Sequence, residues 1–317
     1  MLRYAMRRIA YAIPTLILIA IGVFFMVHLL PGDPVEALVG SEATQEDIEA
    51  AKERLGLNES LAVQFGSWVS GMFTGDMGTS YATGRDVSIM IGGALPITVT
   101  LAVCALIVCL IIGIPGGIFS AMNKGTLLDK FILGGSLVGI SVPSFVMGVL
   151  LMLIFAVWLK WFPSSGYVDV FDDPIGGLRA LTLPAVSLGL LYAATMARIG
   201  RAATLEVVSM DYVDMARASG IPELRVRFRY ILKNALIPII TVTGVTFGGL
   251  LGGAVVTERV FNLSGIGTLI INSITRRDYP VIQAAVLLCA VIYIVINLLV
   301  DILYAAIDPK VHYGDNG

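Results

Sequence analysis

Six apolar stretches, separated by polar loops of unequal length, dominate the pattern of the chain. A helix needs about 20 mostly apolar residues to cross the hydrocarbon core of a bilayer. Each stretch is close to that length or longer, and the fourth is the shortest. They comprise residues 9–30, 95–121, 131–158, 181–199, 236–257 and 280–306. The pattern therefore predicts an all-α integral membrane protein with six transmembrane helices.

The composition agrees with a membrane-embedded chain. Of the 317 residues, 57% are hydrophobic and 14% are charged, whereas about a quarter of the residues in soluble domains are charged. Cys104, Cys109 and Cys289 all fall in apolar stretches and form no CxxC pair, which is typical of small packing residues. His28 and His312 lie far apart in the sequence, so we expect no metal site.

The placement of lysine and arginine predicts which loops face the cytoplasm. The loop at 31–94 has three basic residues against ten acidic ones, whereas the segment at 198–238 has seven basic residues. The loop at 259–278, with three arginines on the opposite face, is the exception. The balance predicts that both termini are cytoplasmic. The stretch at 9–30 exceeds the about 7–15 residues of a signal-peptide core, so we expect it to be retained as the first span.

The loop at 31–94 contains helix signals of its own. Thr44 and Asp47 have the spacing of a capping box, and Gly56 follows the apolar positions as a stop signal. Asn58 is positioned to cap a second helix, whose aromatic stripe includes Trp68. That helix lies either at the membrane surface or against the spanning helices, and the sequence favours neither.

The sequence lacks the features that would let the chain drive transport by itself. No G-x-x-x-x-G-K-[ST] phosphate-binding loop is present. The inner thirds of the spans contain essentially none of the carboxylates or histidines that ion-coupled carriers place at mid-membrane. We therefore expect that the chain is not an enzyme, binds no cofactor itself and takes its energy from another chain. An ion-coupled secondary carrier and a structural membrane scaffold are the rival classes.

The segment at 198–238 is polar and basic, and it lies between the fourth and fifth spans. Its helical pattern is broken at Gly220-Ile221-Pro222, since glycine suits a helix C-terminus and proline prevents continuation. Ala216, Ala218 and Ser219 give the preceding helix a small, flat face. Such a helix between two spans predicts a docking surface for a soluble protein.

The residues before the break resemble a family signature. They have the spacing of the E-A-A-x-x-x-G motif in the last large cytoplasmic loop of importer-type ATP-binding-cassette (ABC) permeases. Asp214 stands in place of the glutamate and Met215 in place of the first alanine, and the later proline comes five residues late at Pro238. The matching stretch reads Asp214-Met215-Ala216-Arg217-Ala218-Ser219-Gly220.

Further stretches resemble the dipeptide/oligopeptide/nickel group of these permeases, in particular the first permease of that group. Together they extend over essentially the whole chain. They are Gly75–Ser80, Pro143–Phe145, Trp161–Tyr167, Asp211–Val213, Ser264–Gly267, Arg277–Pro280 and Leu299–Lys310.

The resemblance implies the type I ABC importer permease fold, a location in the bacterial inner membrane, and defined partners. These are a homologous second permease, two ABC ATPases that bind ATP and Mg, an extracytoplasmic substrate-binding protein and membrane lipids, with no nucleic acid. The family forms a coupling helix that docks into a groove of the ATPase. The residues to which this role transfers are Asp211, Tyr212, Asp214, Ala216, Arg217, Ala218, Ser219 and Gly220.

The implied substrates are di- or oligopeptides, with the chain forming half of the translocation pathway. A permease for nickel or nickel chelates, or for glutathione, is the alternative within the same family. We expect three regions. Residues 1–94 hold the first span and the acidic loop, 95–306 form the core with the coupling-helix loop 200–235, and 307–317 form a cytoplasmic tail.

Two features of the sequence stay open. Small residues recur on the fifth span at Gly244, Gly248 and Gly252, which lets another helix backbone approach closely. That neighbour belongs either to this chain or to a partner or pathway-lining arrangement. Basic residues around 225–233 face either lipid headgroups or an ATPase.

Overall fold

The computed structural model describes residues 2–29, 35 and 44–307, and these residues are mainly helical. They group into two compact units, one made of the described residues within 1–7, 99–263 and 295–317, the other of those within 8–98 and 264–294. The compact units therefore do not follow the predicted division at residues 94 and 306. Of the predicted tail at 307–317, all but the first residue lies outside the described residues.

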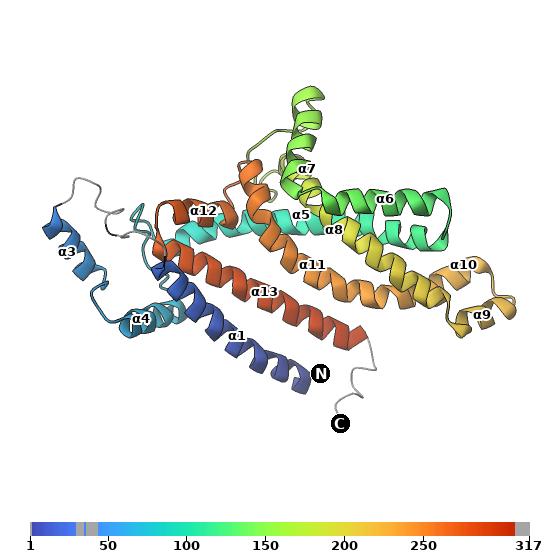
Figure 1. Cartoon of the computed structure of the whole chain (residues 1–317), viewed down its shortest axis with the longest axis horizontal. Coiled ribbons are helices and arrows are strands. Elements are labelled where there is room, and N and C mark those ends of the chain that lie inside the picture. Colours follow the sequence, from blue (N-terminus) through green and yellow to red (C-terminus); the bar gives the residue numbers. More distant parts are fainter. Residues whose placement is uncertain (1, 30–34, 36–43, 308–317) are drawn as a thin grey trace. The chain divides into compact units, whose positions relative to one another are not determined.

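Among the described residues, five helices are long and apolar enough to cross a membrane, and a bent pair of helices makes a sixth candidate when it is taken as one span. The five helices are α1 (Leu2–His28), α5 (Val87–Met122), α8 (Pro174–Val208), α11 (Lys233–Val260) and α13 (Tyr279–Ile307) (Figure 1). The fourth predicted span, 181–199, is much longer than expected. It begins as α8 where Asp173 caps the first turn and Pro174 occupies the first helical position.

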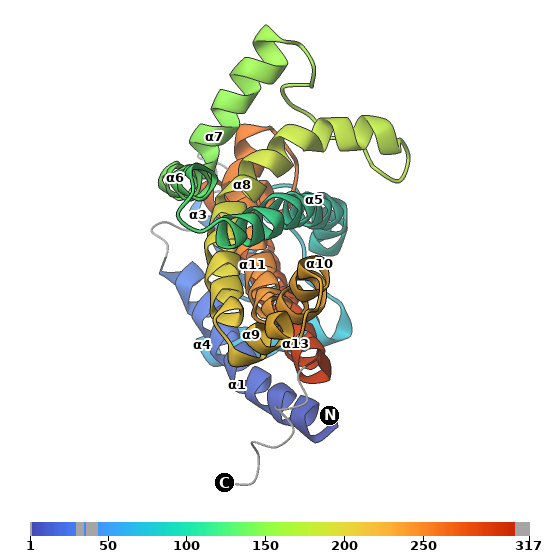
Figure 2. The same cartoon turned by 90° about the vertical axis from the view of Figure 1, so that its right-hand side faces the viewer.

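The third predicted span, 131–158, is bent. The helix α6 (Leu127–Ser141) ends at Val142, and the chain continues as α7 (Ser144–Leu151) and the π-helical segment η1 (Met152–Trp158) after a bend of 103° (Figure 2). Proline at 143 has no N–H to donate and pushes the preceding Val142 into the extended region, at φ −90° and ψ 118°. The bend therefore follows directly from one proline.

Close helix packing organises the larger unit. α8 packs against α6, α7 and α11, and Cys109, Met196 and Ile239 form a buried apolar cluster between α5, α8 and α11. A Cβ atom on Gly117 of α5 would lie 2.5 Å from the carbonyl oxygen of Ala197. Since that neighbour is backbone and cannot move aside, α5 and α8 reach this distance only because residue 117 is glycine.

In the smaller unit, the capping box predicted at Thr44 and Asp47 is confirmed. It starts α3 (Gln45–Arg54), with both reciprocal hydrogen bonds present. The predicted cap at Asn58 is wrong. The next helix, α4 (Leu61–Thr74), has Ser60 at its N-cap, and the side-chain amide of Asn58 instead donates to Glu49 Oε1 at 3.0 Å.

The aromatic stripe of α4 packs against a spanning helix. The rings of Phe65 and Trp68 lie 5.2 and 6.0 Å from the ring of Phe24 on α1, measured between centroids. Of the two positions that the sequence left open, the structure therefore shows packing against the spans.

Two of the stretches that carry the family resemblance meet in this unit, although about 200 residues separate them. Ser80 Oγ and the Tyr81 N–H both donate to the Asp278 carboxylate, the latter at 2.9 Å. Ser80 and Asp278 are each 2% exposed. Burial raises the pKa of Tyr81 to about 12, and the negative charge of Asp278 adds to the shift. The two hydrogen bonds to Asp278 hold the loop before α5 against the start of α13.

Candidate functional site

The segment that the sequence singled out folds into a compact helical turn between two spans. After α8, the short helix α9 (Asp211–Ala218) is followed by α10 (Glu223–Arg225) and the π-helical segment η2 (Val226–Leu232), which leads into α11. Figure 1 shows α9 and α10 next to each other at one end of α8 and α11. The predicted docking segment is therefore a structured element and not an open loop.

The end of α9 has the geometry that Gly220 predicts. Gly220 has φ +75°, in the left-handed region. Its N–H donates to the Arg217 carbonyl at 3.0 Å, and the Ile221 N–H donates to the Ala216 carbonyl at 3.3 Å. These two bonds form a Schellman motif, which satisfies carbonyls that the helix end would otherwise leave unpaired.

The inner face of α9 packs against its own chain. Val213 and Ala216 are buried at 0% and 5% exposure, in a cluster with Val226, Ile231 and Ala235. The Asn234 side chain donates to the Tyr212 hydroxyl at 3.0 Å. The expectation that Ala216 lies on the flat outward face is therefore wrong, because the spacing from Val213 to Ala216 places both on the buried stripe of the helix.

Most of the remaining predicted residues lie on the outer face of α9 or at its end. Asp211, Asp214, Arg217, Ala218, Ser219 and Gly220 are exposed, and so is Met215, whereas Tyr212 is half-buried. Arg217 lies 3.3 Å from both Asp214 Oδ1 and Glu223 Oε2, and the hydrogen bonds to Glu223 and then to Asp214 raise its pKa. Since these charges pair with one another, the surface that remains for an apolar contact is that of the exposed side chains of Met215, Leu224 and Phe228.

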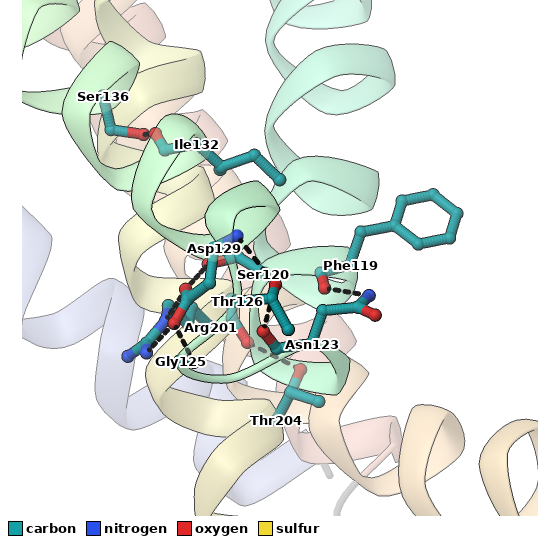
Figure 3. Close-up of polar contacts among 11 residues, drawn as sticks. Phe119, Ser120, Asn123, Gly125, Thr126, Asp129, Ile132, Ser136, Arg201 and Thr204 are labelled. Atoms are coloured by element: carbon teal, nitrogen blue, oxygen red, sulfur yellow. Dashed lines mark hydrogen bonds and ion pairs between the residues drawn. The ribbon is translucent and has the colours of Figure 1, made fainter.

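A partly buried ion pair joins α8 to α6, and the sequence reasoning missed it. The guanidinium of Arg201 on α8 binds the carboxylate of Asp129 on α6 through two parallel contacts, Nε to Oδ1 at 2.8 Å and Nη2 to Oδ2 at 2.9 Å (Figure 3). Asp129 is 3% exposed. Bidentate pairing of this kind is stronger and more directional than a single charged hydrogen bond.

The same carboxylate holds the loop between α5 and α6. It accepts hydrogen bonds from Ser120 Oγ at the end of α5 and from the Gly125 N–H, while Thr126 caps α6 by accepting from the Asp129 N–H (Figure 3). We call Asp129, Arg201, Ser120 and Gly125 the loop clamp. The spacing from Thr126 to Asp129 is a capping signal in the sequence, but nothing local indicates Arg201 as the partner.

The glycines of α11 divide between two environments. A Cβ atom on Gly244 would overlap Val300 of α13, and Gly248 is buried. Gly252 is exposed, and a Cβ atom at this position would have no neighbouring atom within 4 Å. Close approach within this chain therefore accounts for Gly244, and Gly252 lies on a free face.

The described residues offer little to a metal ion. They contain no group of three or more His, Cys, Asp or Glu side chains placed to hold one.

Up to six apolar spans among the described residues, with a structured polar turn before α11, define a multi-pass membrane protein. Residues 113–313 match the family described as binding-protein-dependent transport system inner membrane component, and residues 1–102 match the N-terminal region of such components. The chain belongs to this family. It is a multi-pass inner-membrane permease subunit of an ABC importer, and ATP hydrolysis belongs to partner subunits.

Similar curated proteins cover nearly the full length of the chain. A putative peptide transport system permease protein of Brucella suis is 40% identical over 308 residues, which are 97% of this chain and 98% of the relative. The glutathione transport system permease protein GsiC of Salmonella typhimurium is 42% identical over 313 residues, covering 99% of this chain and 100% of the relative.

Solved structures support the fold. Chains from two crystal forms of the MetNI methionine ABC transporter, determined in inward-facing conformations, align with TM-scores of 0.57 and 0.58. They share 17% and 18% identity, and each alignment covers 69% of this chain and 96% of the other. The predicted importer permease fold is confirmed.

Proposed function

We propose that the chain forms half of the translocation pathway of an ATP-driven importer for peptides delivered by an extracytoplasmic binding protein. The observation that supports this most directly is full-length identity of 40% to a relative named as a peptide transport permease. The glutathione permease at 42% identity supports glutathione as the second candidate. Glutathione is itself a tripeptide, so both relatives favour a peptide-like solute. Support for nickel complexes as substrates comes only from the resemblance to the dipeptide/oligopeptide/nickel group of permeases.

Uptake by the reconstituted transporter tests this proposal. The chain would be placed in proteoliposomes with its second permease, its two ATPases and the purified binding protein. We expect ATP-dependent accumulation of labelled Ala-Leu or longer peptides, and of glutathione if the second candidate holds. Accumulation of a nickel–histidine complex alone, or of no solute, would overturn the peptide assignment.

We further propose that the outer face of α9 enters a groove of one ATPase subunit. Both termini would then be cytoplasmic, and the chain would pair with a homologous second permease while ATP and Mg bind in the ATPases. Met215 and Ala218 are central to this contact, since both are exposed beside charges that already pair with one another. A small or flexible side chain surrounded by neutralised charge suits insertion into a partly apolar groove.

Substitution of Ala218 tests the docking proposal. An Ala218→Glu change adds a charge that would be buried in the groove, so we expect co-purification of the ATPases to fall about tenfold or more. Phe171→Glu is the matched control, because Phe171 is 86% exposed and lies outside this turn. Unchanged ATPase association and uptake in the Ala218→Glu variant would contradict docking through α9.

A further inference from the structure

The smaller unit contains a cavity that the proposed function does not use. It has a volume of about 620 Å³ and lies between the end of α1, the segment after α3, the helix α4, residues 76–81 and the start of α13. All of its lining residues belong to the unit made of 8–98 and 264–294. Sites for small organic ligands have volumes of about 300–1,000 Å³, so the cavity has room for one.

One wall of the cavity is a row of ring systems. Between centroids, Phe24 lies 6.0 Å from Trp68 and 4.4 Å from His28, and His28 lies 6.2 Å from Tyr279. All four residues line the cavity, and Phe24 and Tyr279 are 2% and 6% exposed. Such a wall offers apolar surface to a ligand and π faces to a cation.

Charged side chains line another part of the cavity, at exposed positions. Arg54, Glu59 and Asp76 are exposed and line the cavity. Within the described part of the chain, none of the three has an ion-pair partner. Asp76 Oδ1 accepts one hydrogen bond, from the Gly78 N–H at 2.9 Å. One cationic and two anionic groups therefore surround the same space without neutralising one another.

A buried amide adds an independent indication of a ligand. Gln283 on α13 is 6% exposed and lines the cavity. Its amide therefore faces the cavity from a buried position. The lining also holds a buried polar atom without a hydrogen-bond partner among the described residues, Nε1 of Trp68. Since buried polar groups in folded proteins are nearly always hydrogen-bonded, this indole N–H is suited to a ligand group that accepts.

We propose that this cavity binds a small zwitterion with an apolar side chain, of the class of a short peptide. Glu59, Asp76 and the ring wall suit its ammonium group, Arg54 suits its carboxylate, and Gln283 suits a peptide amide. The chemistry of the ligand follows from these groups alone. That the occupant is a transported peptide rests on the proposed function, and the cavity is then a binding site of the permease itself.

Fluorescence of Trp68 tests the proposal on the full chain in lipid nanodiscs. The chain has three tryptophans, so a Trp158→Phe/Trp161→Phe background leaves Trp68 as the sole reporter. The probe is Ala-Leu, which does not fluoresce in this range. We expect a saturable change with Ala-Leu, and affinities about tenfold lower for N-acetyl-Ala-Leu and for Ala-Leu amide, since each loses one charge-assisted contact.

Single substitutions with matched controls test which side chains bind the charged groups of Ala-Leu. We expect Glu59→Gln to weaken Ala-Leu binding about tenfold and to remove the difference between Ala-Leu and its N-acetyl form. The control Glu53→Gln removes the same charge from an exposed position that does not line the cavity, and it should leave binding unchanged. Arg54→Gln should correspondingly remove the difference between Ala-Leu and its amide. All three positions are exposed, so these variants are expected to fold.

Several results would overturn the proposal. One is no saturable Trp68 signal up to about 10 mM Ala-Leu, where even weak complexes form. Another is equal binding by Glu59→Gln and Glu53→Gln. A third is that Glu59→Gln weakens only the association with the purified binding protein, which would make the cavity a protein contact. Uptake in proteoliposomes is measured separately, so loss of the peptide transport assignment with a retained Trp68 response leaves the cavity proposal standing.

Discussion

The carboxylate of Asp129 connects three chain segments through four hydrogen-bond donors. Its oxygens accept from Ser120, Gly125 and two nitrogens of Arg201. A carboxylate this fully bonded fixes the end of α5, the loop before α6 and the C-terminal part of α8 relative to one another. Because α8 leads directly into α9, a force on α9 would reach the loop clamp through one continuous helix.

We expect Asp129→Asn to destabilise the protein by about 2 kcal/mol, because it leaves the Arg201 guanidinium partly buried without a counter-charge. The measurement is thermal unfolding of the detergent-solubilised chain. Asp172→Asn, at an exposed position, serves as the control. In an Asp129→Asn/Arg201→Gln variant the loss should be smaller than the sum of the single losses. Additive losses would show that the two side chains are not coupled.

Gly220 provides a second prediction for a single residue. Its φ of +75° is unfavourable for residues with a Cβ, and no atom lies within 4 Å of that Cβ position. A Gly220→Ala variant should therefore lose about 1 kcal/mol through the backbone alone, and Gly220→Asn should lose less. Gly134→Ala is the control, since Gly134 is helical and also has free space. Equal unfolding temperatures for the two alanine variants would refute this reasoning.

The spacing of apolar and polar residues along α9 determines which face of the helix is buried and which is exposed. Val213 and Ala216 face the chain, whereas Asp214, Met215 and Ala218 face outward. The π-helical segment η2 completes the buried side through Val226 and Ile231. α9 therefore has a fixed orientation on its own chain before any partner binds, which limits the entropy lost on docking.

An alanine-to-leucine change should affect stability differently on the buried and the exposed face of α9. Ala216→Leu inserts a large side chain into a filled cluster and should cost about 1–3 kcal/mol of stability. Ala218→Leu adds the same atoms at an exposed position, and it should leave the unfolding temperature unchanged while weakening ATPase association. Thermal unfolding and co-purification of the ATPases measure the two effects. A destabilised Ala218→Leu variant, or a stable Ala216→Leu variant, would contradict the orientation of α9.

At the scale of the whole molecule, the described residues form two compact units that alternate along the sequence. Residues 264–294 belong to the smaller unit, because α12 (Ile266–Thr275) and the start of α13 pack against the first turns of α5. The Ile266 N–H donates to Thr98 Oγ1 at 2.8 Å, and Asp278 holds the loop at Ser80 and Tyr81. Pairing of distant segments defines this unit.

The predicted topology can be tested on the whole molecule in intact cells. In a background without Cys104, Cys109 and Cys289, single cysteines would replace Ser70 on α4 or Ser219 beside α9. Both serines are exposed. We expect a membrane-impermeant maleimide to label position 70 but to label position 219 only after the cells are lysed. The reverse pattern would show that the termini are not cytoplasmic.

The sequence by itself determined the spans, the membrane location, the capping box at Thr44 and the end of α9 at Gly220. Each of these depends on the residues within one local stretch: apolar length, side-chain caps, or the conformational freedom of glycine. The bend after α6 was also indicated locally, since Pro143 stands inside an apolar run.

Only the tertiary structure decided which side chains meet across the fold. It supplied the residues of η2, Val226 and Ile231, that cover Val213 and Ala216, and it paired Asp129 with Arg201, 72 positions apart. It also brought the rings of α1, α4 and α13 around one cavity, beside charged side chains that form no ion pair within the described residues. Such contacts depend on how helices pack, and packing is set by shape complementarity between distant surfaces that no local spacing encodes.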